Sequence, residues 1–198
     1  MSSQYNEDDI IHRYFGGKRD GRFLDLGAYD GKTFSNTFAL AEKGWSGVCV
    51  EASPQCFVQL QKTYQQNPNI KLVNAAIADK RGCLLFYDNG GAIASLCEDH
   101  MEKWKEYDAF VPIHVASICV GDLLEVFPSP YDFVSIDIEG LSLDAFQWLP
   151  RLDSLGVKLC CVEAATPGET TQANALAEAH GLTFFDKTIE NLFYKVKE

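Results

Sequence analysis

Acidic residues stand where several apolar runs of this sequence end. Glu51 closes the second run, Asp137 the fourth and Glu163 the fifth, and Asp25 lies in the first run just before a glycine turn. Carboxylates in such places can hold positive charge, accept hydrogen bonds from ligand hydroxyls or transfer protons. If the runs are neighbouring parallel strands, their carboxyl ends meet at the sheet edge where ligands of such folds bind.

The apolar runs alternate with segments of helical composition, which favours a doubly wound, mostly parallel α/β sheet with right-handed crossovers. The expected strands are residues 22–26, 47–51, 70–78, 132–137 and 157–163. The expected helices are residues 33–43, 54–66, 142–148 and 169–180. Two closely spaced strands at residues 182–185 and 192–196 predict an antiparallel ending.

Between residues 83 and 120 this alternation weakens, so we expect an insertion before the fourth core strand, on the substrate side of the cleft. Its expected parts are a hairpin at 83–88, a turn at Gly90 and Gly91, a short helix at 98–105 and a strand at 114–120. Residues 1–20 are expected to be an N-terminal helix or extension. With 198 residues, the chain is close to one domain of about 150 residues, so 1–198 is predicted to be a single domain.

Composition excludes several classes of protein. Apolar residues make up 46% and charged residues 23%, as in ordinary globular proteins. A net charge of -11 opposes general nucleic-acid binding, which draws on a basic surface. No apolar run approaches the ~18 residues of a membrane span, and the polar start is not a secretory signal. The seven cysteines show no C-x-x-C spacing and are expected to be structural thiols of a cytoplasmic protein.

The glycine turn and Glu51 together predict an adenosine ligand. Gly27 and Gly31, spaced four apart, allow the backbone to turn sharply and approach a ligand closely. Glu51 lies 20 residues beyond Gly31, at the strand end from which an acid accepts hydrogen bonds from ribose hydroxyls. The alternative is an ordinary tight turn followed by a solvated glutamate.

Charge distinguishes between the adenosine cofactors. A dinucleotide would place its anionic pyrophosphate among Asp25, Asp30 and Asp137, and the third glycine of its fingerprint is missing. S-adenosyl-L-methionine carries a sulfonium and an ammonium group, which an acidic pocket complements. A nicotinamide-dependent oxidoreductase is therefore the weaker alternative.

At this point the sequence resembles the FkbM-type family of S-adenosylmethionine-dependent methyltransferases, over about residues 21–163. The matching motifs are the runs 21–31, 35–37, 44–47, 50–54 and 74–79 and the signature Asp137-Ile138-Glu139-Gly140. The resemblance implies a Rossmann-like class I methyltransferase fold with seven strands, the last antiparallel. It also implies, for most of the family, O-methylation of small molecules or sugars.

Residue by residue, the resemblance implies a cofactor loop at Asp25, Gly27, Ala28 and Gly31, a ribose acid at Glu51, and signature acids at Asp137 and Glu139. Their neighbours at the strand ends, Tyr29, Ala52, Ala75 and Ala76, complete the cofactor site that we expect. This chain departs from the family pattern where Tyr29 replaces a middle glycine, Ala52-Ser53 replaces Pro-Asn, and Gly121 replaces an acid.

Methyl transfer needs an acceptor that loses a proton, hence a general base or a metal ion. Asp137 is the predicted central residue, which either holds the amino end of the cofactor or acts on the acceptor. Glu139 is the second, although Glu139 also suits a helix N-terminus. Glu163 could share a proton or a divalent cation with Asp137, and His100 in the insertion is a candidate base or a solvated side chain. Whether a metal ion takes part is left open.

We therefore expect O-methylation of a small-molecule or sugar-type acceptor. N-methylation is one alternative, because one sequence does not separate oxygen from nitrogen acceptors. The other is a module that binds S-adenosylmethionine without catalysis. Arg13, Lys18, Arg19 and Arg22 suggest either capture of an anionic acceptor or a solvated basic face, and the sequence does not set the oligomeric state.

Overall fold

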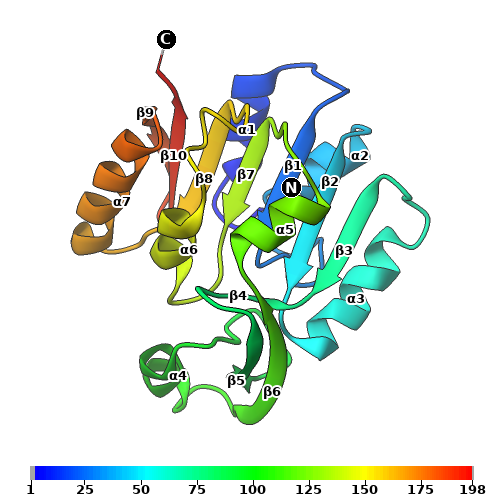
Figure 1. Ribbon diagram of the computed structural model, residues 1–198, viewed down its shortest axis with the longest axis vertical. Coiled ribbons are helices and arrows are strands. Elements are labelled where there is room, and N and C mark those ends of the chain that lie inside the picture. Colours follow the sequence, from blue (N-terminus) through cyan, green and yellow to red (C-terminus); the bar gives the residue numbers. More distant parts are fainter. Residues whose placement is uncertain (1–2, 198) are drawn as a thin grey trace.

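The computed structural model describes residues 3–197 and contains a seven-stranded main sheet (Figure 1). Its spatial order is β3-β2-β1-β7-β8-β10-β9. The strands are β1 Arg22–Leu26, β2 Ser46–Glu51, β3 Ile70–Asn74, β7 Phe133–Ile136, β8 Leu159–Glu163, β9 Leu182–Lys187 and β10 Asn191–Val196. Neighbours from β3 to β8 pair in parallel, and β10 is antiparallel to both β8 and β9. The seven-stranded, mostly parallel sheet with an antiparallel last strand is thus confirmed.

Side chains on alternate strand positions feed two separate cores, one on each face of the sheet. On one face Leu24 and Leu26 pack with the helices α5 Val120–Val126, α6 Ser142–Trp148 and α7 Pro167–Ala179. On the other face Phe23 and Phe133 pack with α1 Glu7–Phe15, α2 Phe38–Glu42 and α3 Pro54–Tyr64. Burial on both faces explains why the central strands read as nearly continuous apolar runs.

A smaller sheet lies beyond the carboxyl ends of the main strands, at the bottom of Figure 1. Its order is β4-β6-β5, with β4 Ala76–Ile77, β5 Gly82–Asp88 and β6 Val111–Ile118. The connection from β5 to β6 carries α4 Glu98–Trp104, which agrees with the short helix expected there. None of the helices in residues 3–197 combines the length and apolar character needed to cross a bilayer.

One expected helix is shorter than predicted, and one expected strand is divided between the two sheets. The helix expected at 33–43 begins only at Phe38, because Oγ of Ser35 accepts the N–H groups of Thr37 and Phe38 and holds an irregular turn. The strand expected at 70–78 leaves the main sheet after Asn74 and continues as β4 of the smaller sheet. At this break the N–H of Ala75 still donates to the carbonyl of Glu51.

The strands of the smaller sheet also differ from expectation. β5 pairs along its whole length with β6, from Gly82 opposite Ser117 to Asp88 opposite Val111, so residues 83–88 are one strand and not a hairpin. β6 starts at Val111 and ends at Ile118, earlier at both ends than the strand expected at 114–120. Val120 instead begins α5, and it packs into the core with Leu123.

Candidate active site

Two adjoining clefts open at the carboxyl edge of the main sheet, facing the smaller sheet. The smaller cleft encloses about 540 Å³ and the larger cleft about 1720 Å³, both including space open to solvent. Five residues line both clefts, namely Gly27, Tyr29, Ala92, Asp137 and Glu139. The clefts therefore meet at the glycine turn and at the residues after β7.

Glu51 ends β2 in the smaller cleft and is held by backbone donors. The N–H of Tyr29 donates to its Oε2 at 2.8 Å, and the N–H of Ser53 donates to its Oε1 at 2.7 Å. Since a carboxylate has about four acceptor positions, each oxygen can still accept from a ligand hydroxyl. Burial is the main cause that raises the pKa of Glu51 to about 7. Two further donors from a ribose would favour its charged form.

The rest of the smaller cleft is mostly apolar. Ala52 and Ala75 line it just after β2 and β3, and Ala76 lines it from the start of β4. Side chains of the smaller sheet and its loops close it, including Phe86 and Leu96. Apolar walls with a few placed polar groups suit a flat heterocycle attached to a ribose. The predicted cofactor residues Glu51, Ala52, Ala75 and Ala76 thus lie together.

The glycine turn lies close to the residues after β7. Gly27 has a φ of 91°, and a Cβ at this position would overlap the carbonyl oxygen of Asp137, so only glycine fits. Ala28 lines the larger cleft. Gly31 lines neither cleft, because it packs under the turn where a Cβ would collide with Leu60 and Tyr64. The second glycine therefore serves the packing of the turn on α3.

Asp25 precedes the glycine turn and is hydrogen-bonded to Thr37 in the irregular turn that follows it. It is buried, it lines the larger cleft, and its Oδ2 accepts from Oγ1 of Thr37 at 2.6 Å. Burial outweighs this hydrogen bond and raises the pKa of Asp25 to about 6. A cation bound nearby would favour the carboxylate form of Asp25.

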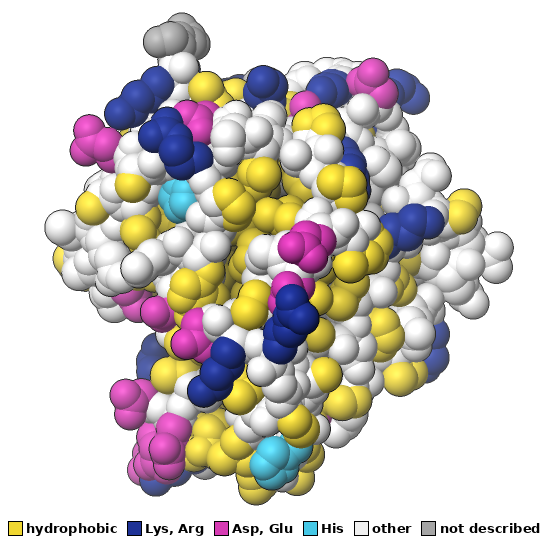
Figure 2. Space-filling view, in the orientation of Figure 1, with side chains coloured by type: hydrophobic (Ala, Val, Ile, Leu, Met, Phe, Trp, Pro, Cys, Tyr) yellow, Lys and Arg dark blue, Asp and Glu magenta, His cyan; other side chains and the backbone are white. Residues whose placement is uncertain are grey.

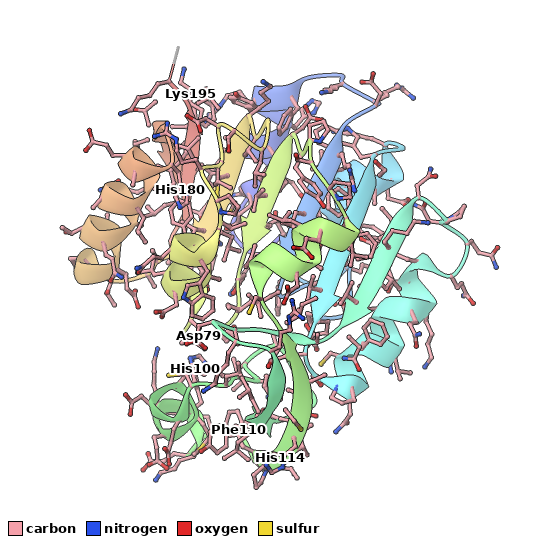
Figure 3. All side chains as sticks on the ribbon, viewed as in Figure 1. Asp79, His100, Phe110, His114, His180 and Lys195 are labelled. Carbon is pink, nitrogen blue, oxygen red and sulfur yellow. The ribbon has the colours of Figure 1, made fainter. Side chains whose placement is uncertain are left out.

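The four predicted catalytic residues come together in the larger cleft. Asp137 and Glu163 both line it, and the carboxyl of each residue shifts the pKa of the other. Oγ of Ser142 donates to Oε2 of Glu163 at 2.8 Å and fixes its orientation. Nε2 of His100 lies 3.4 Å from Oε2 of Glu139, so the insertion reaches the signature acid. In Figure 3 His100 lies between α4 and the lower edge of the main sheet.

Burial sets the protonation of this cluster. It raises the pKa of Glu139 to about 8 and that of Asp137 well above its usual value, and repulsion from Glu163 adds to both shifts. The pKa of Glu163 is raised as well, again chiefly by burial. Burial and the nearby Lys103 lower the pKa of His100. The histidine is therefore neutral near pH 7, while the acids share protons that a bound cation would displace.

These residues fit S-adenosylmethionine better than a metal or a dinucleotide. Glu51 offers acceptor positions for a ribose, and the carboxyls shared by the two clefts suit a sulfonium and an ammonium group. A pyrophosphate at the same turn would be repelled by Asp25 and Asp137. Within residues 3–197, no group of three or more His, Cys, Asp or Glu side chains has the arrangement to hold a metal ion. The sequence left open whether a divalent cation takes part, and these residues offer no candidate site for one.

Two contacts that the sequence did not reveal join the smaller sheet to this site. Oγ of Ser53 donates to Oδ1 of the buried Asp88 at 2.9 Å. Oγ of Ser95 donates to the carbonyl oxygen of Glu139 at 2.5 Å. Of the newly found residues, only Ser53 could have been identified from the sequence, because it stands where a helix N-cap is expected, just before a proline. The partners come from the smaller sheet and its loops, whose placement follows from tertiary contacts.

The basic residues near the N-terminus do not line either cleft. Lys18 pairs with Asp132 at 2.6 Å, Arg22 donates to the carbonyl oxygen of Pro128, and Arg13 pairs with Asp186. Lys18 and Arg22 thus contact residues just before β7, at the amino edge of the sheet. They have no part in capturing an acceptor at the carboxyl edge.

Comparison with known proteins shows the family and the fold of this chain. A family model for the methyltransferase FkbM domain matches residues 25–191. The chain is also similar to the solved METTL16 MTase domain, with 14% identity and a TM-score of 0.57 over 98% of this chain and 67% of that chain. No curated protein matches the sequence.

Two further solved structures share the fold. A methyltransferase FkbM from Methylobacillus flagellatus KT shows 11% identity and a TM-score of 0.55, over 89% of this chain and 44% of that chain. A precorrin-6y C5,15-methyltransferase from Geobacter metallireducens GS-15 shows 12% identity and a TM-score of 0.54, over 96% of this chain and 87% of that chain. At such identities the likeness concerns the fold, and the chain spans less than half of the Methylobacillus protein.

Proposed function

Since this chain belongs to the FkbM methyltransferase family and is thus an S-adenosylmethionine-dependent methyltransferase, we propose that it methylates a hydroxyl oxygen of a small, sugar-type acceptor. The observation that carries the choice of oxygen is the neutral His100, whose Nε2 lies 3.4 Å from Glu139 where the two clefts meet. A hydroxyl needs a base at this place, and a neutral imidazole is one.

The cofactor would be held by three groups of the chain. Glu51 accepts from the ribose hydroxyls, the turn at Gly27 and Tyr29 supports the ligand from below, and Asp137 faces its positive charge. When bound, S-adenosylmethionine supplies an electrophilic methyl group and leaves as a neutral thioether. The acidic lining therefore stabilises S-adenosylmethionine, with its positive sulfonium, more than the product, whose thioether is neutral.

His100 takes the proton of the acceptor hydroxyl as the oxygen gains the methyl group. The imidazolium so formed lies beside Glu139, whose carboxylate stabilises it. Asp137 and Glu163, with Ser142 behind them, keep the neighbouring carboxyls in fixed positions. The proton then passes from Nε2 to solvent through the larger cleft, and the site returns to its first state.

N-methylation is the second candidate, favoured by the acidic lining of the larger cleft, which attracts an amine. A module that binds the cofactor without catalysis is the third. Product analysis separates all three, because an O-methyl ether, an N-methyl amine and unchanged acceptor differ by mass spectrometry after acid treatment and fragmentation.

The test is turnover with S-adenosylmethionine carrying a labelled methyl group, over a panel of sugar hydroxyls, amines and carboxylates. We expect labelled O-methyl product together with S-adenosylhomocysteine. His100→Gln should lower kcat by about 100-fold or more while the variant still binds S-adenosylhomocysteine. Labelled N-methyl product would replace oxygen by nitrogen as the acceptor, and cofactor binding without any product would show a non-catalytic module.

A cytoplasmic location belongs to the same proposal. All seven cysteines are free, and Cys49, Cys56, Cys160 and Cys161 are buried. Burial raises the pKa of the thiol of Cys56 to about 11, so it stays protonated at neutral pH. Free buried thiols of this kind fit a reducing compartment.

A further inference from the structure

The larger cleft contains more acidic groups than the chemistry of methyl transfer requires. Beyond the acids already described, Asp144, Glu169 and Glu190 line its outer part. Lys103 is the single Lys or Arg among the described residues that line it. The surplus of negative charge therefore continues from the methyl-transfer site toward solvent.

Glu190 connects the outer acids with the inner ones. It lines the same cleft as both inner acids, its charge raises the pKa of Glu139 and of Glu163, and its Oε1 accepts from the hydroxyl of Tyr5 at 3.5 Å. Asp144 and Glu169 are exposed on the first turns of α6 and α7, and Oε2 of Glu169 also accepts the N–H of Thr166 in a capping box. Glu190 is thus the best placed of the three to bind a ligand that also reaches His100.

Two buried polar atoms on α4 make no hydrogen bond within the described residues, although one of them, Nε2 of His100, lies 3.4 Å from Oε2 of Glu139. The side chain of His100 is 9% exposed, it lines the larger cleft, and its Nε2 makes no hydrogen bond within the described residues. Nε1 of Trp104, one turn further along the same helix, is also buried without a partner. Buried polar groups are nearly always hydrogen-bonded, so these two atoms point to a ligand that supplies their partners.

The two atoms require different partners. The backbone of Ile93 raises the pKa of His100, as a carbonyl beside a ring N–H does, which leaves Nε2 of the neutral imidazole as an acceptor. Nε1 of Trp104 is a donor that needs an acceptor. A compound with neighbouring hydroxyl groups offers both, because a hydroxyl can donate and accept.

From this arrangement we infer that the acceptor is a hydroxyl compound carrying an ammonium group, of the kind found in amino sugars. The hydroxyl to be methylated donates to Nε2 of His100, and a second oxygen accepts from Nε1 of Trp104. The ammonium group is bound by Glu190, with Asp144 and Glu169 adding to the negative field. This inference rests on the proposed O-methylation and names its class of acceptor.

A positively charged acceptor would also favour the ionised form of Glu139, which lies beside the base His100. An ammonium group at Glu190 offsets the repulsion that this carboxylate exerts on Glu139. The pKa of Glu139 would then be lower when the acceptor is present, which favours the carboxylate that serves as counter-charge for the imidazolium of His100. A neutral or anionic acceptor lacks this effect.

The test compares glucosamine, glucose and glucuronate as probes, because they share one scaffold and differ in charge. Each is titrated into wild-type protein saturated with S-adenosylhomocysteine, at a pH where glucosamine is cationic, and binding is followed by tryptophan fluorescence and by NMR. We expect glucosamine to bind at least about tenfold more tightly than glucose, and glucuronate to bind most weakly. Added salt should reduce the preference.

The matched variants are Glu190→Gln and Glu106→Gln. Glu106 is an exposed acid beyond the end of α4 that does not line the cleft. We expect Glu190→Gln to reduce the preference for glucosamine over glucose to about threefold or less, and Glu106→Gln to leave it unchanged. A preference that Glu190→Gln leaves intact would overturn the assignment of Glu190.

Equal affinities for glucosamine and glucose, or no binding of glucosamine up to about 10 mM, would overturn the inference. S-adenosylhomocysteine is titrated first in the same preparation, so the two failures can be told apart. If it binds and glucosamine does not, the cationic acceptor is wrong and the methyltransferase site stands. If it does not bind, the proposed function itself fails.

Discussion

Glu51 is the residue whose surroundings say most about the cofactor. Its two oxygens are fixed by the N–H groups of Tyr29 and Ser53, and it faces the apolar cleft with acceptor positions to spare. A carboxylate held this way recognises a diol without rearrangement. Replacing it by the isosteric amide keeps the shape and removes the charge.

Glu51→Gln should weaken binding of S-adenosylmethionine by about 10- to 100-fold, since hydrogen bonds to charged groups contribute about 1.5–3 kcal/mol. Equilibrium dialysis with labelled cofactor measures the change. Glu42→Gln, at an exposed position of α2, is the matched control and should bind like wild type. Wild-type affinity in Glu51→Gln would remove the ribose assignment.

Glu139 and His100 together predict the pH dependence of turnover. The pKa of Glu139 is raised to about 8 and that of His100 is lowered, so raising the pH first leaves the histidine neutral and then ionises the acid. We expect kcat/KM to rise through about pH 8 and then level off. Because the carboxyls interact, this apparent pKa belongs to the cluster of Asp137, Glu139 and Glu163.

Glu139→Gln should lower kcat/KM and remove the part of the rise near pH 8, leaving a profile that reports His100. A stopped assay for S-adenosylhomocysteine across pH 5–9 measures both profiles. An unchanged profile in this variant would show that Glu139 is not the group that titrates.

At the scale of elements, the smaller sheet is part of the site because two hydrogen bonds connect it to the main sheet. One of them, from Ser95 to the carbonyl oxygen of Glu139, lies between the loop before α4 and the signature turn. Glu139 has a φ of 44°, so its backbone lies in the left-handed region, which is uncommon for residues other than glycine. The hydrogen bond from Ser95 stabilises this conformation.

Ser95→Ala should therefore raise KM for cofactor and acceptor by a few-fold and lower the free energy of unfolding by about 1 kcal/mol. Ser117→Ala is the control, because its hydroxyl donates to the carbonyl oxygen of Lys80 within the smaller sheet. Steady-state kinetics and urea unfolding measure both effects. Equal changes of KM in the two variants would show a general loosening instead of a specific contact.

The elements also show what the sequence could predict. Strands buried on both faces produce continuous apolar runs, so the main sheet and the acids at its strand ends followed from local patterns, including Glu51 and Asp137. The turn at 33–37 did not, because the local hydrogen bonds of Ser35 that hold it compete with a helical pattern, and Thr37 is also fixed by Asp25, 12 residues away. The roles of Asp88 and Ser95 could not be predicted either, because they depend on contacts with residues far away in the sequence.

For the whole molecule, the buried acids predict how stability depends on pH. The folded protein raises the pKa of Glu51 from 4.5 to about 7 and that of Asp25 from 3.8 to about 6. Between these values the folded chain binds more protons than the unfolded chain, so stability falls as the pH rises. For Glu51 alone this amounts to roughly 3 kcal/mol between pH 4 and pH 8.

Urea unfolding of the ligand-free protein should thus give a lower free energy of unfolding at pH 8 than at pH 5.5. Glu51→Gln should flatten the dependence between pH 5.5 and pH 8, because the amide does not titrate. Adding S-adenosylmethionine should restore stability at pH 8 in wild type, because the ligand binds only the folded state. Greater stability at pH 8 than at pH 5.5 in the ligand-free protein would contradict these raised pKa values.

The claim that everything else depends on is that buried carboxyls at one edge of the sheet bind a cationic methyl donor. Calorimetric titration with S-adenosylmethionine near pH 7, in two buffers of different ionisation enthalpy, tests it most directly. We predict binding accompanied by net release of protons, because the positive ligand ionises acids of the cluster around Asp137. Absence of binding, or binding with uptake of protons, would contradict it.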